Sequence, residues 1–461
     1  MPCDYGFRPA IRGISNDSDI ALKHTYHIET FGCQMNKNDS ELMALSLSDH
    51  GFQSAPAGAT ADITIYNTCS VREHAENRVL SRIRSHRKRL RDRDGIIVVA
   101  GCMAQRLGQE LIETGIADMV IGPYQSPDIG RLLRRHLDDR AARTFLSQDI
   151  SDFSGRIKHD LYKVNDTPEW HKWVTITHGC ENYCSYCIVP FVRGRLISFP
   201  SEEVLDYIRT LAAGGIREIT LLGQNVNQYG SDSGDIPFYR LLEAAAAIGG
   251  IERINFITSH PKDFSDDILH VIRDMPNISR SIHLPLQSGS DRVLELMNRG
   301  YTFSDYMAII GKIRKILDRS SISTDLIVGF PGESGDEFDD TLRAVETIRF
   351  DDAFTYAYSS RRGTPAASLT ESLSRAEKNA RLETLIALQR GISKQKLREQ
   401  IDSIEEAIIE RLSKKSPDRV MGKTYLNHVV ITSGTRDDIG KRMKIKISGV
   451  LGSTLQGTRI A

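Results

Sequence analysis

Three cysteines lie close together near the middle of the chain, without a fourth beside them. Cys180, Cys184 and Cys187 form a C-x3-C-x2-C pattern within residues 178–187. Three thiolates can bind three irons of a four-iron cluster, which leaves one iron open to a small molecule. Since clusters that only transfer electrons normally take four cysteines, this pattern predicts a site for chemistry. The alternative is a zinc site that His178 completes.

Three further cysteines are far apart in the sequence but occupy equivalent positions. Cys33, Cys69 and Cys102 each fall just after an apolar segment that predicts a β-strand. In a parallel sheet the carboxyl ends of the strands share one edge, and ligands of such folds bind there. The sequence therefore predicts that these cysteines meet and hold a second cluster, again with one open iron. The alternative is that they are buried free thiols that pack as small hydrophobic side chains.

Alternating strand and helix patterns around Cys33, Cys69 and Cys102 predict an α/β domain over residues 24–150, with a doubly wound parallel sheet. Strands are expected at 25–30, 62–67, 96–100 and 117–122, and helices at 39–45, 75–83 and 107–112. The polar, aperiodic residues 1–23 predict a flexible tail, which contains Cys3, and residues 151–171 predict a linker.

A second α/β series is predicted over residues 172–398. Six strands are expected, at 174–177, 218–222, 253–258, 281–284, 323–328 and 353–358, before a long helix at 374–400. Six βα units are too few for a closed eight-fold barrel and favour an open, partial barrel. Residues 399–461 alternate apolar and polar positions, as in Met443–Ser448, and predict a small antiparallel β-barrel.

Composition excludes several classes of protein. Lys plus Arg and Asp plus Glu are balanced at 60 each, so any site for a polyanion must be a local patch. No apolar stretch is long enough to span a membrane, and the first residues lack the pattern of a signal peptide. Seven cysteines in 461 residues do not make a disulfide framework, and they favour metal ligands in a reducing cytoplasm.

Four motifs resemble the radical S-adenosylmethionine methylthiotransferases. They lie at residues 30–41, 67–73, 179–193 and 284–291, and the resemblance runs from about Tyr26 to the C-terminus. It implies a methylthiotransferase N-terminal domain, a partial (βα)6 barrel and a C-terminal TRAM domain that binds RNA. The implied reaction adds a methylthio group to carbon 2 of an N6-isopentenyladenosine next to the anticodon of tRNA. The implied cofactors are two [4Fe-4S] clusters and S-adenosylmethionine, with an electron donor such as flavodoxin or ferredoxin, and the protein is expected to be a cytoplasmic monomer.

Further residues are expected to contact the cofactor. By resemblance, Tyr186 matches an aromatic position placed against the adenine of S-adenosylmethionine. Polar side chains at strand ends are also expected to contact the cofactor, because the active sites of barrels of this kind lie at the carboxyl ends of their strands. These residues are Gln224, Asn225, Ser259 and Gln287. Residues 327–333 match part of a superfamily motif that contributes Gly329, Gly332 and Glu333. The alternative is that the polar residues cap strand ends and that the glycines serve a tight turn.

The chain departs from the family pattern at a few positions. Its basic residues offer two candidate regions for binding RNA. Leu196 and Phe199 replace a glutamate and an arginine after the cysteine loop, and Arg362 replaces a proline. A basic run at 82–91 is predicted to be a solvated helix face. Near the C-terminus, Lys444 and Lys446 share one face of a predicted strand, beside Lys441 and Arg442, and suit phosphate contacts.

Other functions remain open from the sequence. One alternative is that the chain is a methylthiotransferase that acts, with the same clusters, on threonylcarbamoyl-adenosine in tRNA or on an aspartate of a ribosomal protein. A different class is an iron–sulfur protein that binds RNA or senses a signal without turnover. Two three-cysteine sites beside a cofactor-type barrel favour an enzyme over such a sensor.

Overall fold

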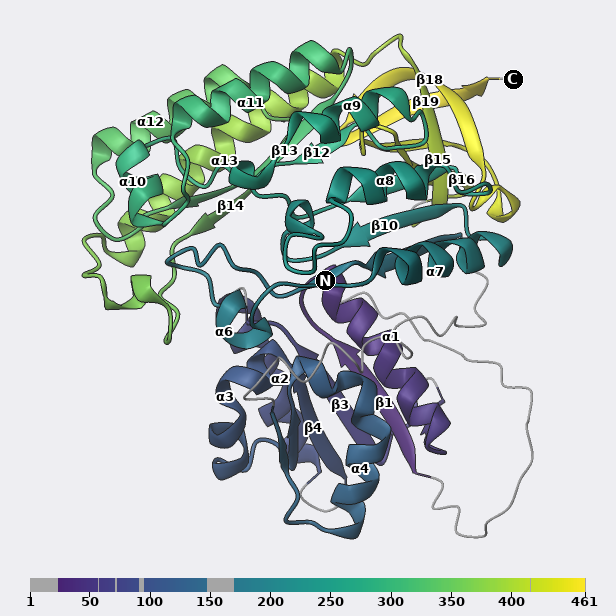
Figure 1. The fold of residues 1–461 in the computed structure, drawn as a ribbon, viewed down its shortest axis with the longest axis vertical. Coiled ribbons are helices and arrows are strands. Elements are labelled where there is room, and N and C mark those ends of the chain that lie inside the picture. The colour runs from purple at the N-terminus through teal and green to yellow at the C-terminus, as the bar shows by residue number, and fades with distance from the viewer. Residues whose placement is uncertain are drawn as a thin grey trace. The chain divides into compact units, whose positions relative to one another are not determined.

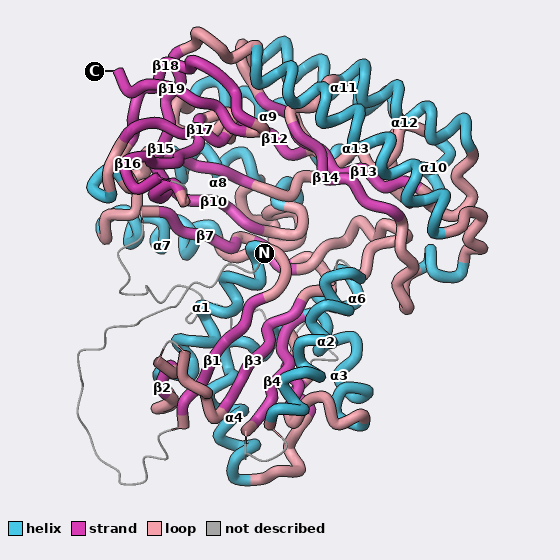
Figure 2. The backbone as a smooth tube through the Cα atoms, turned by 180° about the vertical axis from the view of Figure 1, so that it is seen from behind, coloured by secondary structure: helices cyan, strands magenta, loops and turns pink. Residues whose placement is uncertain are grey.

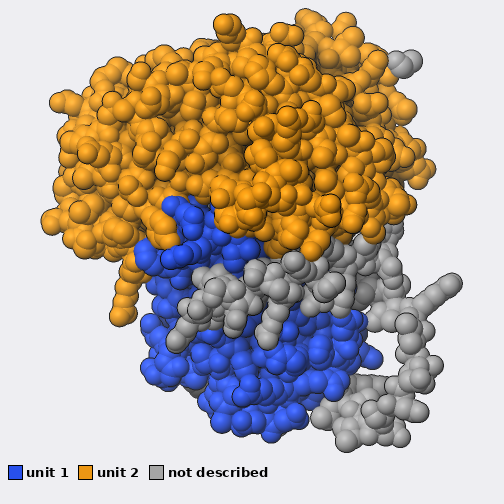
Figure 3. Space-filling model, in the orientation of Figure 1, with its two compact units in different colours: residues 1–168, 178–181, 187–197 blue, residues 169–177, 182–186, 198–461 orange. Residues whose placement is uncertain are grey.

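The computed structural model describes residues 24–56, 58–70, 73–90, 95–146, 170–414 and 416–460. The predicted tail 1–23 and most of the predicted linker 151–171 lie outside these ranges. The chain divides into two compact units (Figure 3): residues 1–168, 178–181 and 187–197 form the first unit, and residues 169–177, 182–186 and 198–461 form the second. The predicted boundaries at 150, 172 and 399 stay predictions, since the second unit contains both of the later domains.

A parallel sheet forms the centre of the first unit, in the order β2-β1-β3-β4-β5-β6. Its strands are β1 (Thr25–Thr30), β2 (Gln53–Ser54), β3 (Ile63–Thr68), β4 (Ile96–Gly101), β5 (Met119–Ile121) and β6 (Thr144–Phe145). Its helices are α1 (Gln34–Asp49), α2 (Glu73–Arg89), α3 (Cys102–Glu113), α4 (Ile129–Asp138) and α6 (Val189–Arg193), with the 3-10 helix η1 (Pro123–Asp128). The predicted strands and helices are therefore confirmed, and β2 and β6 are short edge strands beyond them.

Alternation along the strands explains why helices cover both faces of this sheet. Ile63 and Ile65 of β3 belong to one hydrophobic core with residues of α1 and α4. Figure 1 shows the ribbons of β3 and of these two helices. Tyr66 of β3 and Val99 of β4 belong to a second core with residues of α2 and α3. The doubly wound architecture predicted from the sequence is confirmed.

Six parallel strands of the second unit form two sheets of three (Figure 2). One sheet contains β7 (His171–Thr175), β10 (Glu218–Leu222) and β11 (Arg253–Phe256), and the other contains β12 (Ser281–His283), β13 (Ser321–Val328) and β14 (Asp352–Ala357). All six predicted strands are present, but β11 and β12 form no ladder, and only an isolated bridge joins Ile254 to Ile278. The short strands β8 (Thr177–His178) and β9 (Ile197–Ser198) lie in the segment around the cysteine loop.

Helices follow these strands in alternation, as the βα pattern predicts. They are α7 (Ser201–Ala213), α8 (Phe238–Ala246), α9 (Asp266–Asp274), α10 (Asp291–Leu296), α11 (Phe303–Ile316), α12 (Gly335–Ile348) and α13 (Arg375–Arg398). Single 3-10 turns occur at η3 (Val226–Gln228), η4 (Pro261–Asp263), η5 (Pro365–Ser368) and η6 (Arg436–Asp438). Capping boxes at Ser334 and Ser374 start α12 and α13. In each, the serine side chain accepts the backbone N–H of a glutamate three residues later, and the side chain of that glutamate accepts the backbone N–H of the serine.

The C-terminal strands pair in a closed ring, in the order β15-β16-β17-β19-β18. They are β15 (Ile404–Ser413), β16 (Ser416–Thr424), β17 (Val429–Ser433), β18 (Arg442–Leu451) and β19 (Thr454–Ile460). The inward positions Met443, Ile445 and Ile447 of β18 belong to its core. The β structure expected here is confirmed with one correction: β17 and β19 pair in parallel, so the pairing is not wholly antiparallel.

The loop between β16 and β17 attaches this β structure to the N-terminal ends of the parallel strands. The Tyr425 hydroxyl donates to the Glu252 carbonyl, 2.8 Å away, just before β11. Ser279 Oγ donates to the Tyr425 carbonyl at 2.9 Å, and Ser321 Oγ donates to the Leu426 carbonyl at 2.7 Å. These contacts leave the opposite, carboxyl ends of the strands to the functional residues.

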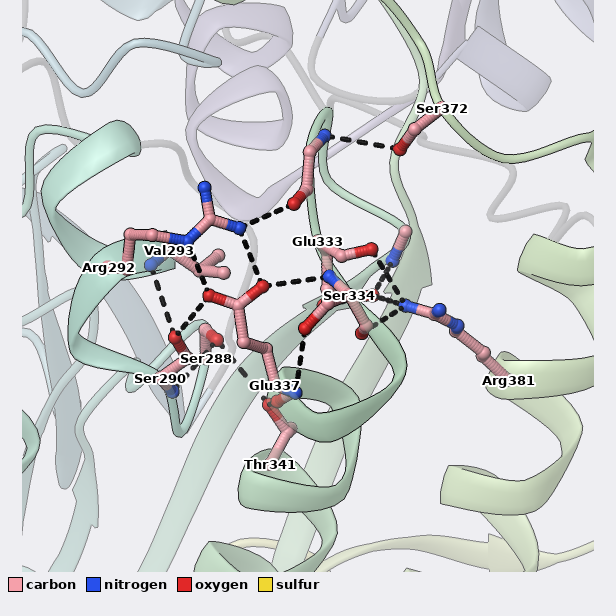
Figure 4. A network of polar contacts seen from close by, with 12 residues as sticks. Ser288, Ser290, Arg292, Val293, Glu333, Ser334, Glu337, Thr341, Ser372 and Arg381 are labelled. Atoms are coloured by element: carbon pink, nitrogen blue, oxygen red, sulfur yellow. Dashed lines mark hydrogen bonds and ion pairs between the residues drawn. The ribbon is translucent and has the colours of Figure 1, made fainter.

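Glu337 fixes the start of α12 and gives a testable pH dependence (Figure 4). Its carboxylate accepts from Arg292 Nε and Nη2 at 2.7 and 2.6 Å and from the Ser334 N–H at 2.8 Å. The Arg292 contact, aided by Ser334 and Ser290, lowers the pKa of Glu337 from 4.5 to about 2. A lowered pKa gives stability that is present above about pH 4.5 and is lost as the pH falls towards 2.

We expect Glu337→Gln to lower the thermal midpoint at neutral pH and to flatten its fall between about pH 4.5 and 2. The matched control is Glu346→Gln, which removes an exposed carboxylate from the same helix. Thermal unfolding followed by circular dichroism across this pH range measures both effects. Parallel pH profiles for the wild type and Glu337→Gln would contradict the assignment.

Candidate functional site

The set of Cys33, Cys69 and Cys102 lies at the carboxyl edge of the N-terminal sheet. Cys33 is the N-cap of α1 after β1, Cys69 directly follows β3, and Cys102 is the first residue of α3 after β4. Because β1, β3 and β4 are neighbours in the sheet, the topology brings the three residues to one edge. The strand order reverses between β1 and β3, which is where sheets of this type bind ligands.

The thiols of this set influence one another. A hydrogen bond with Cys69 lowers the pKa of Cys33 to about 6, and the Arg193 charge contributes in the same direction. Burial raises the pKa of Cys102. Gly32 has φ +120°, and a Cβ there would lie 2.4 Å from the Cys69 Cβ, so only glycine lets the chain pass so close to Cys69. The sequence thus places Cys33 and Cys69 side by side.

A buried arginine contacts this cysteine set from the segment that follows the other one. Arg193, at the end of α6, donates from Nη2 to Asp39 Oδ2 at 2.6 Å and from Nε to Cys102 Sγ at 3.3 Å. The side chains of Arg193 and Asp39 are 3% and 4% exposed, so the ion pair is almost fully desolvated. Sequence reasoning treated Arg193 only as part of the cysteine-loop motif and missed this role, since 91 residues separate it from Cys102.

The C-x3-C-x2-C set is described in two parts, because Cys180 and Cys187 belong to the first unit and Cys184 to the second. In the first unit, the Cys180 N–H donates to the Gly194 carbonyl at 3.1 Å. Gly179 has φ +70°, and a Cβ there would lie 1.8 Å from the Arg195 carbonyl oxygen, so the approach to Cys180 requires glycine.

In the second unit, Cys184 is buried beside an arginine and a histidine. Arg299 Nη1 donates to Cys184 Sγ at 3.2 Å, and His260 Nε2 lies 3.9 Å from the same sulfur. Tyr186 packs against the core that contains Phe330 and Tyr358, and its hydroxyl lies 3.4 Å from Arg299 Nη1.

Single metal ions and iron–sulfur clusters require different arrangements of cysteines. Among the described residues, no three Cys, His, Asp or Glu side chains converge closely enough to hold one ion. A four-iron cluster does not require such convergence, because each thiolate binds a different iron. A zinc site completed by His178 would need its ligands around one ion. Burial lowers the pKa of His178 to about 3, aided by the charge of Arg193, whose Nη1 lies 3.5 Å from its ring.

Polar side chains with unpaired oxygen atoms follow the strands of the second unit. Among the residues that the structure describes, a buried side-chain oxygen in each has no hydrogen-bond partner, and the residues are Gln224, Asn225, Ser259 and Gln287. Gln224 and Asn225 follow β10, Ser259 follows β11, and Gln287 follows β12. Since buried polar atoms are nearly always paired, these atoms fit a polar ligand at the carboxyl ends of the strands. Gln287 also has φ +75°, which is uncommon for a residue with a side chain and typical of functional sites.

Sequence reasoning missed two polar residues beside this set. Both polar side-chain atoms of Asn227 are buried and have no hydrogen-bond partner in the described part of the chain. Asp263 Oδ2 accepts from Asn225 Nδ2 at 2.6 Å and from Asn182 Nδ2 at 3.1 Å, so it connects the cysteine loop with the end of β10. Asn227 could have been found from its place after the same strand as Gln224, whereas no sequence signal pointed to Asp263.

The predicted glycine motif forms a tight turn after β13. Glu333 Oε2 accepts from the Gly329 N–H at 2.7 Å and from Arg381 Nη1 at 2.6 Å (Figure 4). Gly329 and Gly332 have φ +69° and +83°, which glycine adopts readily. This geometry supports the turn that the sequence left as the alternative. Glu333 Oε1 is buried and has no hydrogen-bond partner among the described residues.

The departures from the family pattern do not disturb the fold. Leu196 and Phe199 are buried apolar side chains, and the Phe199 carbonyl accepts from the Tyr229 hydroxyl at 2.6 Å. Arg362 is exposed.

Comparisons with known proteins agree with these observations. Residues 174–345 match the radical SAM superfamily, and residues 25–122 match the uncharacterized protein family UPF0004. A tRNA-2-methylthio-N(6)-dimethylallyladenosine synthase of Carboxydothermus hydrogenoformans is 40% identical over 431 residues, which cover 92% of this chain and 96% of the relative. The enzyme of the same name from Thermoanaerobacter pseudethanolicus is 42% identical over 440 residues, covering 94% and 92%.

A solved structure shares the fold. The radical S-adenosylmethionine methyltransferase TsrM from Kitasatospora setae superposes with a TM-score of 0.54 at 12% identity, covering 75% of each chain. In the part of the chain that the structure describes, no helix is both long and apolar enough to cross a membrane.

Proposed function

The chain belongs to the family of the tRNA-2-methylthio-N(6)-dimethylallyladenosine synthases, and we propose that it adds a methylthio group to carbon 2 of N6-dimethylallyladenosine next to the anticodon of tRNA. The observation that carries this proposal is the pair of three-cysteine sets, each without a fourth cysteine. Carbon 2 of adenine has an unactivated C–H bond, which side-chain acids and bases cannot functionalise. The reactivity must therefore come from a cofactor that the protein positions.

Cys180, Cys184 and Cys187 would hold a [4Fe-4S] cluster whose open iron binds S-adenosylmethionine. Bound there, the cluster and S-adenosylmethionine would supply a radical that can abstract hydrogen from carbon. The unpaired oxygen atoms of Gln224, Asn225, Ser259 and Gln287 would accept hydrogen bonds from the cofactor. Tyr186 would lie against its adenine, while Gly329, Gly332 and Glu333 would shape the turn beside it.

Cys33, Cys69 and Cys102 would hold a second [4Fe-4S] cluster, and its open iron would carry the sulfur that is transferred. The mutual hydrogen bond of Cys33 and Cys69 and the lowered pKa of Cys33 favour the thiolate form that binds iron. Two incomplete ligand sets suit two tasks, one for radical chemistry and one for sulfur delivery.

The C-terminal β structure would bind tRNA as a TRAM domain. Lys444 and Lys446 are exposed on β18, on the face opposite the buried Met443, Ile445 and Ile447. A row of lysines on an open strand face suits contacts with phosphates rather than with bases. Arg442 is engaged by Glu406, 3.6 Å away, so the two lysines are the better candidates.

The substrate is tested by the nucleosides of cellular tRNA. We expect that deleting the gene removes 2-methylthio-N6-isopentenyladenosine and leaves its N6-isopentenyladenosine precursor, and that the wild-type gene restores the product. Nucleoside mass spectrometry of digested tRNA measures both compounds. If the product is unchanged and 2-methylthio-threonylcarbamoyladenosine disappears instead, the substrate is the alternative one.

A further inference from the structure

Arg299 is a deeply buried cation that has no carboxylate partner among the described residues. It is 4% exposed and follows α10. Nη2 donates to the Pro285 carbonyl at 2.9 Å, and Nε donates to the Tyr301 hydroxyl at 2.9 Å. Nη1 faces Cys184 Sγ at 3.2 Å and the Tyr186 hydroxyl at 3.4 Å. Of these partners, only the cysteine belongs to the C-x3-C-x2-C set.

Two other deeply buried arginines show what such a residue normally requires. Arg193 pairs with Asp39 at 2.6 Å, and Arg253 pairs with Glu218 at 2.5 Å. A guanidinium stays charged in proteins, and burying it without an anion costs several kcal/mol. Arg299 thus suits an anion that the carboxylates of the described residues do not supply.

His260 adds a second donor to the same sulfur. Its Nδ1 accepts from the Lys262 N–H at 3.3 Å, so in the neutral ring the proton is on Nε2. Nε2 lies 3.9 Å from Cys184 Sγ, on a segment distinct from that of Arg299. Cys184 is therefore approached by a full positive charge and by a ring N–H.

We propose that Arg299 is the counter-charge of the cluster that Cys184 helps to hold, and that it raises the reduction potential of this cluster. The inference rests on the proposed function. A [4Fe-4S] core in its oxidised state, bound by three thiolates, has a net negative charge, and reduction adds a further one. A fixed cation and hydrogen bonds to a ligand sulfur stabilise the reduced state more than the oxidised state. Arg193 differs, because Asp39 already neutralises it, so the two cysteine sets have different electrostatic surroundings.

The experiment is a redox titration followed by electron paramagnetic resonance. It compares Arg299→Gln and Arg299→Lys with their parent, a full chain in which Cys33, Cys69 and Cys102 are alanine, so that one cluster gives the signal. We expect Arg299→Gln to lower the ratio of reduced to oxidised cluster at a fixed potential by about tenfold. This change corresponds to a fall of about 59 mV in the reduction potential of a one-electron couple. Arg299→Lys keeps the charge and should retain most of the parent potential. An unshifted potential in a fully iron-loaded Arg299→Gln variant would overturn the inference.

A second measurement separates the loss of a counter-charge from a structural defect. Unfolding by urea is compared for parent and variant, each with and without iron. Losing a counter-charge lowers the free energy of unfolding mainly in the loaded protein. Losing a purely structural arginine lowers it by the same amount in both forms. Equal destabilisation in both forms would therefore overturn the inference. A parent that binds no iron would refute the proposed function itself, and this outcome differs from a loaded parent whose variant is unchanged.

Discussion

Replacing Cys33, Cys69 and Cys102 together by alanine is expected to remove about half of the iron and to abolish methylthio transfer, while S-adenosylmethionine is still cleaved. The three residues follow neighbouring strands of the first unit, and none of them belongs to the C-x3-C-x2-C loop. Removing one ligand set should therefore leave the other able to bind its iron. Iron analysis, deoxyadenosine formation and nucleoside mass spectrometry measure the three quantities separately.

The matched control removes the other set. With Cys180, Cys184 and Cys187 changed to alanine, about half of the iron should again be lost, but cleavage of S-adenosylmethionine should disappear too. Loss of cleavage in the first triple variant would contradict the division of tasks. Unchanged iron content there would contradict the second cluster, and would leave the three residues as free thiols.

The fold was largely predictable because its strands carry strong local patterns. The apolar segment at 218–222 becomes β10 with the same bounds, since a parallel strand is covered on both faces. Helix α1 begins at Gln34, five residues before the predicted start at Asp39. The prediction missed this start because the first residues of the helix include the buried polar Asn36 and Asn38 and show no apolar stripe. The parallel pairing of β17 with β19 could not be predicted, since alternation indicates a strand but not the direction of its neighbour.

The site was predictable where topology brings its residues together. Cys33, Cys69 and Cys102 could be placed at one edge because each follows a strand of one parallel sheet. The two arginines could not be found in this way. Arg193 lies 91 residues from Cys102, and Arg299 lies 115 residues from Cys184, so only tertiary packing brings each pair into contact. A surface arginine and a buried one look alike in a single sequence.

Arg193→Met is expected to destabilise the part of the first unit around α1 and α3 by about 3–5 kcal/mol. The change removes the partner of Asp39, which is 4% exposed, and leaves its carboxylate buried without a counter-charge. It also removes the donor to Cys102 Sγ. Hydrogen exchange measured by mass spectrometry reports local opening without requiring the whole chain to unfold in one step. Peptides from α1 and α3 should exchange faster, by the factor that corresponds to this loss of local stability. Peptides from α13 should exchange at the wild-type rate.

The double variant Asp39→Leu with Arg193→Met separates the ion pair from general packing. Because replacing a buried pair by apolar side chains is often neutral, the double variant should recover most of the protection that Arg193→Met loses. It would still lack the donor to Cys102, so its second cluster should be held less firmly and release iron to a chelator faster than in the wild type. If the double variant exchanged as fast as Arg193→Met, the cost would come from lost arginine packing, and the buried pair would not be what stabilises this edge of the sheet.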